Sequence, residues 1–196
     1  SASATAECIF AILKVIHAVI DDNMASALYT GISTDTGCFK YSNVTAKTHM
    51  IAAMLYDYNI NMAEINRLMF DTKSKNLLDL ECRVLENMEY HFDDKCVVLT
   101  VTKEMQNETG CFGSELEGIA LISRSVEGTD IGITIKQTND DSFKVSIRTF
   151  EKISAAEIAK VLGGGGHKSA AAAILKGNIG EVKSQILTVV SRYMED

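Results

Sequence analysis

Residues 131–148, IGITIKQTNDDSFKVSIR, decide the fold of the second half of the chain. Residues 131–135 form a short β-branched run, and residues 143–148 alternate apolar with polar side chains, as a strand with one buried face does. The polar tetrad 139–142 between them has the composition of a hairpin loop. Two consecutive strands joined by a tight turn are therefore predicted here.

The segments around this hairpin predict a layer of strands covered by helices. Cys96–Val101 is another β-branched run, and residues 171–175 form a further short apolar pattern. Apolar residues at three- and four-residue steps predict helices over three segments, 114–125, 154–162 and 179–194. This arrangement favours an α+β domain over residues 93–196.

The first half of the chain carries helical patterns instead. Residues 3–20 form an amphipathic pattern, and Ser3 is expected to cap its start. A second helix is expected from Asp22 to the turn Thr34-Asp35-Thr36-Gly37, where glycine is a natural terminator. Further helical periodicity covers residues 50–58, 62–69 and 78–88. We therefore expect two domains, 1–92 and 93–196.

The overall composition excludes several classes of protein. Of the 196 residues, 46% are hydrophobic and 23% are charged, which rules out disorder, collagen and a coiled-coil rod. The 19 basic against 26 acidic residues give a net charge of −7, so generic binding to duplex DNA is not expected. No apolar run approaches the roughly 20 residues that span a bilayer, so we expect a cytoplasmic protein away from membranes. The 5 widely spaced cysteines are typical of reduced thiols.

Asp35 is the first candidate site residue. It lies among small hydroxyl and glycine residues in the segment GISTDTGCF, residues 31–39, and could offer a carboxylate oxygen to a hard divalent cation. The structural alternative is an aspartate that satisfies backbone N–H groups in a helix-terminating turn. Aspartic proteases also use Asp-Thr-Gly, but they need two such loops, and this chain has one in a helical setting.

The second candidate site is the glycine run before His167. Four consecutive glycines allow successive N–H groups to converge on an anion, and His167 adds a protonatable donor. A flexible, unoccupied loop is the alternative. Two side chains of the predicted hairpin strand, spaced two apart and so on one face, could hold the same phosphate. The substrate-binding candidates are Gly164, Gly165, Gly166, His167, Ser146 and Arg148.

In order and spacing, these motifs resemble the DHH-family phosphoesterases, in the subfamily of oligoribonuclease and pAp phosphatase (nano-RNase) proteins related to RecJ exonucleases. The resemblance covers nearly the whole chain. It rests on Ser3-Ala4-Thr5-Ala6-Glu7, on LYTGISTDTGCF at residues 28–39, on Val145-Ser146-Ile147-Arg148, and on the glycine run with His167.

The resemblance implies a catalytic DHH domain that holds two Mn²⁺ ions and a DHH-associated domain that grips the substrate. Asp35 would be a metal ligand and so part of the catalytic centre, while the glycine run, His167 and Arg148 would contact phosphate. Two metals would polarise a phosphoryl oxygen and supply a hydroxide for in-line attack. Residues 1 to about 58 would then be the last helices of a doubly wound α/β domain, exposing apolar surface or forming a homodimer through it, and a helical linker would continue to residue 92. Residues 93–196 would be the DHH-associated α+β domain with a mixed sheet.

The chain departs from the family pattern at several positions. No Asp-His-His triplet occurs in it, and one carboxylate cannot hold two metals, so we expect a fragment that is not competent for catalysis alone. Thr149 stands where serine is usual, and Ala172 stands where glycine is usual.

The leading hypothesis is a fragment of a Mn²⁺-dependent hydrolase of short oligoribonucleotides or 3′-phosphoadenosine 5′-phosphate (pAp). A non-catalytic nucleotide- or RNA-binding module, like the domains that end alanyl-tRNA synthetases, is one alternative. An exopolyphosphatase-related protein is another.

Overall fold

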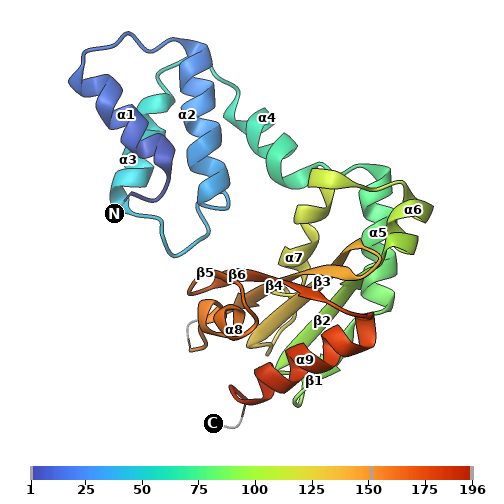
Figure 1. Ribbon diagram of the computed structural model, residues 1–196. Coiled ribbons are helices and arrows are strands. Elements are labelled where there is room, and N and C mark those ends of the chain that lie inside the picture. The colour runs from blue at the N-terminus through green and yellow to red at the C-terminus, as the bar shows by residue number, and fades with distance from the viewer. Residues whose placement is uncertain (1, 151, 195–196) are drawn as a thin grey trace. The chain divides into compact units, whose positions relative to one another are not determined.

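The computed structural model describes residues 2–150 and 152–194, and the chain divides into two compact units (Figure 1). The first unit is residues 1–73 and the second is residues 74–196. Each unit has an apolar core of its own. The class is mixed α/β, with a helical first unit and an α+β second unit, as expected.

The first unit consists of helices around a small core. Its elements are α1 (Thr5–Val15), α2 (Asp22–Asp35), α3 (Ala46–Leu55), α4 (Met62–Asn66) and a π-helical turn (Arg67–Asp71). Side-chain caps explain where several of them begin. The Asp21 carboxylate accepts the Met24 N–H at the start of α2, and Thr45 forms a capping box with Thr48 at the start of α3.

The first helix is shorter than the pattern predicted, and Ser3 does not cap it. Ala4 is the N-cap residue without a side-chain bond, and the helix ends at Val15, two residues before His17 adopts a φ of 53°. The Ser3 hydroxyl instead donates to the Asn43 carbonyl at 2.5 Å. The prediction was wrong because the apolar periodicity continues past the helix on residues outside it: Ile16 and Val19 are exposed, whereas Ile20 is buried in the core without being helical.

An apolar stripe on α1 and the segment after it is exposed. Val15 is 77% exposed and Val19 is 90% exposed, and three isoleucines extend the stripe, namely Ile9, Ile12 and Ile16. The expected exposed apolar surface is therefore present in this unit. Dimerisation through it stays a prediction.

The second unit is built on a six-stranded sheet in the order β1-β2-β3-β4-β6-β5. Strands β2 and β3 are parallel and every other pair is antiparallel, so the sheet is mixed as expected. The strands are β1 (Glu89–His91), β2 (Cys96–Val101), β3 (Ile131–Asn139), β4 (Ser142–Thr149), β5 (Gly165–His167) and β6 (Ala170–Lys176).

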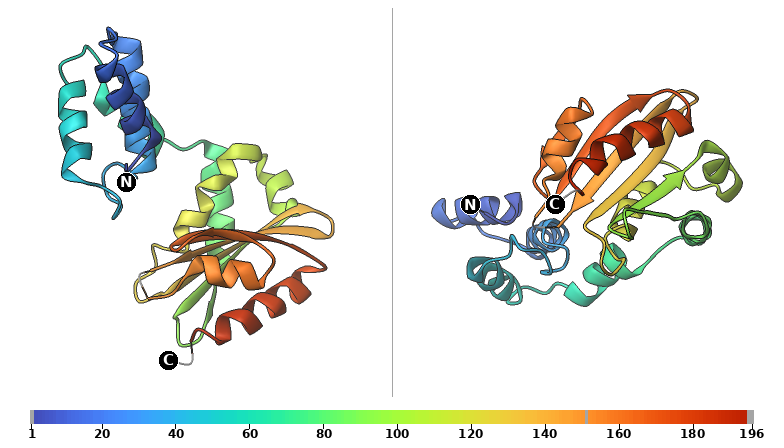
Figure 2. Two further views of the ribbon diagram at one scale, coloured as in Figure 1. Left: turned by 60° about the vertical axis from the view of Figure 1, so that its left-hand side comes forward. Right: turned by 90° about the horizontal axis from the view of Figure 1, so that it is seen from below.

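Helices lie on both faces of this sheet (Figures 1 and 2). On one face, α8 (Ala155–Val161) and α9 (Ile179–Ser191) complete the larger core. On the other face, α5 (Lys75–Glu86) and α7 (Ile119–Ile122) pack with β2 in a smaller core, and α6 (Lys103–Thr109) contributes Met105 to its edge. The strands alternate between the two cores, because successive strand residues point to opposite faces.

The structure corrects several sequence-based expectations in this unit. The helix expected over 114–125 is a 3₁₀ turn (Gly113–Glu117) followed by the one-turn helix α7, separated by Gly118. The glycine run, expected to be a loop, ends in the edge strand β5. The compact units divide after Lys73, because α5 and β1 pack with the sheet, while the domain bounds 1–92 and 93–196 stay a prediction.

Candidate substrate-binding face

Strand β4 carries the polar candidates on one face of the sheet. Phe143, Val145 and Ile147 are buried in the larger core. The alternate side chains of Lys144, Ser146 and Arg148 are half-buried on the opposite face. The expected common orientation of Ser146 and Arg148 is therefore present.

Three rows of side chains cross this face, because strand partners on neighbouring strands point the same way. In the first row, Arg148 pairs through Ala170 with His167. In the second row, Thr134, Ser146, Ala172 and Gly165 follow one another. In the third row, Lys136, Lys144 and Ile174 do so. The sheet thus brings four of the expected residues, Ser146, Arg148, Gly165 and His167, to one face.

A small cavity of about 140 Å³ opens on this face between the sheet and α7. Its polar lining comes from the 3₁₀ turn and from β3 and β4, and consists of Glu117, Thr134, Lys136, Lys144, Ser146 and Arg148. Val101, Leu116 and Ala120 form its apolar side. Gly132 of β3 lets the chain after α7 approach the sheet, because a Cβ there would lie 2.4 Å from the Ser123 hydroxyl oxygen.

The Thr134 hydroxyl and the Lys136 ammonium group are polar groups whose burial in the cavity is unfavourable. The Thr134 hydroxyl is buried and has no hydrogen-bond partner among the described residues. Burial lowers the pKa of Lys136 below its ordinary value, the neighbouring Lys144 lowers it further, and Glu117 opposes the shift. Sequence reasoning missed Thr134, Lys136 and Lys144, although the alternation along residues 131–148 could have placed them on this face.

The four glycines have different structural roles, and two of them, Gly163 and Gly164, terminate α8. The Gly163 N–H donates to the Lys160 carbonyl at 3.1 Å, and the Gly164 N–H donates to the Ala159 carbonyl at 2.7 Å. With Gly163 at a φ of 78°, this is the Schellman arrangement of a helix C-terminus. The expectation that these N–H groups converge on an anion was wrong for both residues, because the helix already uses them.

Gly165 and Gly166 belong to the edge strand. A Cβ on Gly166 would lie 2.5 Å from the Ala171 Cα, whereas a Cβ on Gly165 would meet open space. Packing within the described residues therefore does not require glycine at position 165. The bare backbone there leaves room above the second row of the face, beside Ala172.

The two departures from the family pattern lie in different surroundings. Thr149 is buried, and its hydroxyl donates to the Lys168 carbonyl at 3.1 Å, which fixes the segment after β5. Ala172 lies between Ser146 and Gly165 in the second row, so its methyl group is part of the floor. Arg148 is held in part by a bond of 3.3 Å from its Nη1 to the Ile147 carbonyl.

Asp35 is the last residue of α2 in the first unit, and its side chain is exposed. Asn43 holds this turn, since its amide donates to the Ser3 carbonyl at 2.9 Å and to the Asp35 carbonyl at 3.2 Å. Gly37, at a φ of 55°, lies against the ring of Tyr41.

Within residues 2–150 and 152–194, no three His, Cys, Asp or Glu side chains gather as a metal site requires. The described residues alone do not fit a two-metal pair.

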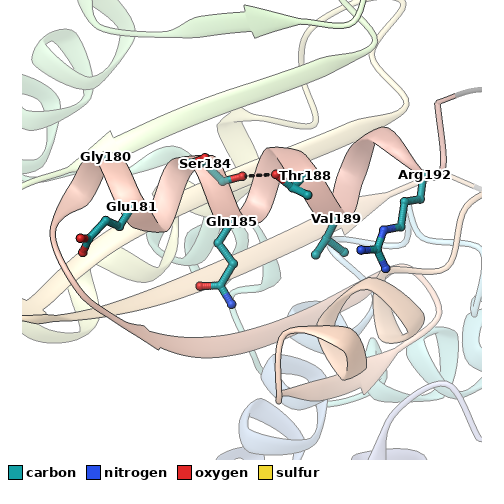
Figure 3. Close-up of a pocket in the computed structure, with 7 residues that line it drawn as sticks. All are labelled: Gly180, Glu181, Ser184, Gln185, Thr188, Val189 and Arg192. Atoms are coloured by element: carbon teal, nitrogen blue, oxygen red, sulfur yellow. Dashed lines mark hydrogen bonds between the residues drawn. The ribbon is translucent and has the colours of Figure 1, made fainter.

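Two other features carry no chemistry. The hollow along α9 is lined by one helix face, on which the Thr188 hydroxyl donates to the Ser184 carbonyl and Glu181 belongs to the capping box (Figure 3). The 5 cysteines are free thiols, as expected. In the part of the chain that the structure describes, no helix has the length and apolar character needed to cross a bilayer.

Comparisons with known proteins agree with this architecture. The DHHA1 domain family matches residues 93–196. The bifunctional oligoribonuclease and PAP phosphatase NrnA of Thermus thermophilus is 34% identical over 178 residues, which are 90% of this chain and 52% of that protein. The A-adding tRNA nucleotidyltransferase of Aquifex aeolicus is 21% identical over 157 residues, 80% of this chain and 19% of that protein.

A solved structure covers nearly the whole chain. The crystal structure of an exopolyphosphatase-related protein from Bacteroides fragilis has a TM-score of 0.91 and 26% identity, covering 98% of this chain and 57% of that one. The chain spans about half the length of the NrnA relatives it matches.

The sheet with its helices and polar face defines an α/β domain of the kind found in DHH-family phosphoesterases. The chain belongs to the DHHA1 domain family, and it corresponds to the C-terminal portion of such phosphoesterases.

Proposed function

We propose that the polar face of β4, β6 and β5 binds the phosphates of short oligoribonucleotides and of pAp, as the substrate-gripping part of a Mn²⁺-dependent phosphoesterase. One observation carries the proposal: Arg148 and Ser146 of β4 share one face with Gly165 and His167 of β5, which pair with β4 through β6. The names of the NrnA relatives point to the same two kinds of substrate.

Each group has a chemical part in this binding. Arg148 offers a guanidinium fork that matches two phosphate oxygens, and Ser146 in the next row offers a hydroxyl donor. His167 lies in the same row as Arg148, exposed at the sheet edge, where it can donate to a phosphate or stack on a base. Gly165 leaves the space that the sugar occupies.

The metal chemistry is a separate part of the proposal. Mn²⁺ prefers oxygen ligands, and Asp35 offers an exposed carboxylate next to a turn that Asn43 holds in place. The described residues do not complete such a site, so no catalytic step is assigned to them. We expect this chain to bind substrate without hydrolysing it. We place the activity in the cytoplasm, where free thiols stay reduced.

A non-catalytic nucleotide- or RNA-binding module is the second candidate. The match to a tRNA nucleotidyltransferase favours it, because the likeness covers 80% of this chain. A binding module would use the same face of the sheet, but it would give the Asp35 turn no functional role. An exopolyphosphatase-related activity is a third candidate, named by the Bacteroides fragilis structure.

Titration of pAp into the chain tests the binding proposal. We expect Arg148→Ala and His167→Ala to weaken binding about tenfold or more, since each removes a charged or protonatable hydrogen-bond donor. Lys160→Ala, on the exposed side of α8, is the control and should keep full affinity. Unchanged binding in Arg148→Ala would remove the proposed contact.

Phosphate release from pAp with added Mn²⁺ tests the metal part. This chain alone is expected to release none. In a longer protein that hydrolyses pAp only with Mn²⁺, Asp35→Asn should abolish release while leaving pAp binding and the unfolding midpoint unchanged. Hydrolysis that survives Asp35→Asn would contradict the assignment of Asp35 to the metal.

A further inference from the structure

Lys136 and Lys144 are directly opposite each other on β3 and β4, a pairing that is unfavourable for two like charges. Both are half-buried at the cavity, and neither has an ion-pair partner among the described residues. Glu117 lines the same cavity without closing an ion pair to either lysine. An arrangement of this kind is stabilised when an anion lies between the two ammonium groups.

The neighbouring row supplies a hydrogen-bond donor. Thr134 is 4% exposed, lines the cavity, and has no hydrogen-bond partner for its hydroxyl within residues 2–150 and 152–194. A buried hydroxyl without a partner costs free energy, and a phosphate oxygen in the cavity would supply the missing acceptor. Thr134 is two residues from Lys136 on β3, so both side chains point to this face.

The uncharged second row separates the two rows that carry cations, the row of Arg148 and the row of Lys136 and Lys144. Lys144 and Arg148 are four residues apart on β4, a span of roughly 13 Å along a strand. Both side chains nevertheless line the same cavity of about 140 Å³, with Ser146 between them. Alongside Ser146, the floor continues over Ala172 and Gly165, which have little or no side chain.

We propose that Lys136, Lys144 and Thr134 form a second phosphate subsite, so that this face selects ligands with one phosphate on each side of a ribose. The inference rests on the proposed function and extends it to the class of substrate. A nucleoside bisphosphate and a short RNA share this phosphate–ribose–phosphate unit. One face would therefore accept both, whereas a nucleoside monophosphate would occupy only the row of Arg148.

Calorimetric titration of the full chain with pAp and with AMP tests the second subsite. We expect pAp to bind about tenfold tighter than AMP, because it adds a charge-assisted contact. Lys136→Met and Lys144→Met should each remove most of this difference and leave the AMP affinity within about twofold. Lys160→Met is the matched control and should preserve the ratio of the two affinities.

The outcomes separate the two proposals. If Arg148→Ala abolishes binding of both nucleotides while Lys136→Met leaves the pAp-to-AMP ratio unchanged, the second subsite is refuted and the proposed function stands. If neither nucleotide binds the unmodified chain, both proposals fail.

Urea unfolding of the lysine variants without ligand supplies an independent check. Lys136→Met should be at least as stable as the original chain, because it removes a like-charge pair. Adding pAp should raise the unfolding midpoint of the original chain more than that of the variant. Equal increases in the midpoint would count against the subsite.

Discussion

Gly165 and Gly166 are neighbours in β5, yet packing within the described residues requires glycine only at position 166. Gly166 has a φ of 154°, and a Cβ on it would lie 2.6 Å from the Ala170 carbonyl oxygen. Gly165 has open space where its Cβ would be. The backbone therefore requires glycine at position 166. At position 165 we expect the proposed ligand to lie against the bare backbone.

Alanine substitutions should separate these reasons. Gly166→Ala should lower the free energy of unfolding by about 1 to 3 kcal/mol, through strain and contact with β6. Gly165→Ala should change it by less than about 0.5 kcal/mol but weaken pAp binding severalfold, because its methyl group fills the floor. Urea unfolding and calorimetry measure both effects. A Gly165→Ala chain that binds pAp with unchanged affinity would show that the bound nucleotide does not contact this residue.

The buried thiol of Cys96 predicts how stability depends on alkaline pH. Burial raises the pKa of Cys96 from its ordinary value of 9.0 to about 12. The unfolded chain thus releases this proton from pH 9 upward, while the folded chain keeps it to about pH 12. The stabilisation is complete below pH 9 and is lost as the pH rises through this window, by up to about 1.4 kcal/mol per pH unit.

Unfolding free energies of Cys96→Ala between pH 8 and pH 11 check the prediction. Their decline should be shallower than that of the original chain, whatever stability the variant loses by leaving a cavity. Cys82→Ala removes an exposed thiol and should keep the original slope. Parallel curves for Cys96→Ala and the original chain would contradict the assignment.

At the scale of elements, a side-chain cap marks where α9 begins. The Asn178 side chain accepts the Glu181 N–H at 3.0 Å, and the Glu181 carboxylate accepts the Asn178 N–H at 2.9 Å. This capping box starts α9, whose residues Val182, Ile186 and Val190 are buried in the larger core.

Removing this cap should destabilise the second unit as a whole. Asn178→Ala is expected to lower the free energy of unfolding by about 1 kcal/mol, and Asn178→Gly by only a few tenths. Thermal unfolding of the three chains gives the comparison. The capping assignment fails if the alanine and glycine variants are equally stable.

Local patterns predicted the strands of the central hairpin but not the short elements around it. β3 and β4 are strongly β-branched or alternating, so their local sequence and their final environment agree. The segment 114–125 has a helical pattern, yet it forms a 3₁₀ turn and a one-turn helix around Gly118. Strand β5 has only glycine and histidine, and its pairing with β6 alone makes it a strand.

At the scale of the whole molecule, the second unit should fold without the first. It contains two of the three apolar cores, and the smaller one joins Leu80 and Val84 of α5 to Val97 and Leu99 of β2. A unit with its own buried core is expected to unfold cooperatively alone.

Two truncations test where this unit begins. A chain of residues 74–196 should unfold cooperatively, whereas residues 93–196 should lose several kcal/mol or aggregate, because removing α5 exposes Val97 and Leu99. Circular dichroism melting and gel filtration give the comparison. Equal stability of the two truncations would show that α5 is not needed for the fold and would favour the predicted boundary at residue 92.

Local sequence was sufficient to predict that Ser146 and Arg148 share a face, because the two-residue period of a strand is a property of its own backbone. It was also sufficient to place Asp35 at a helix end, since a glycine two residues later terminates the helix. Strand pairing, in contrast, brought Lys136 opposite Lys144 and carried Gly165 and His167 to the rows of Ser146 and Arg148. Such neighbours depend on which strands pair and in which register, and long-range burial decides that across the whole sheet.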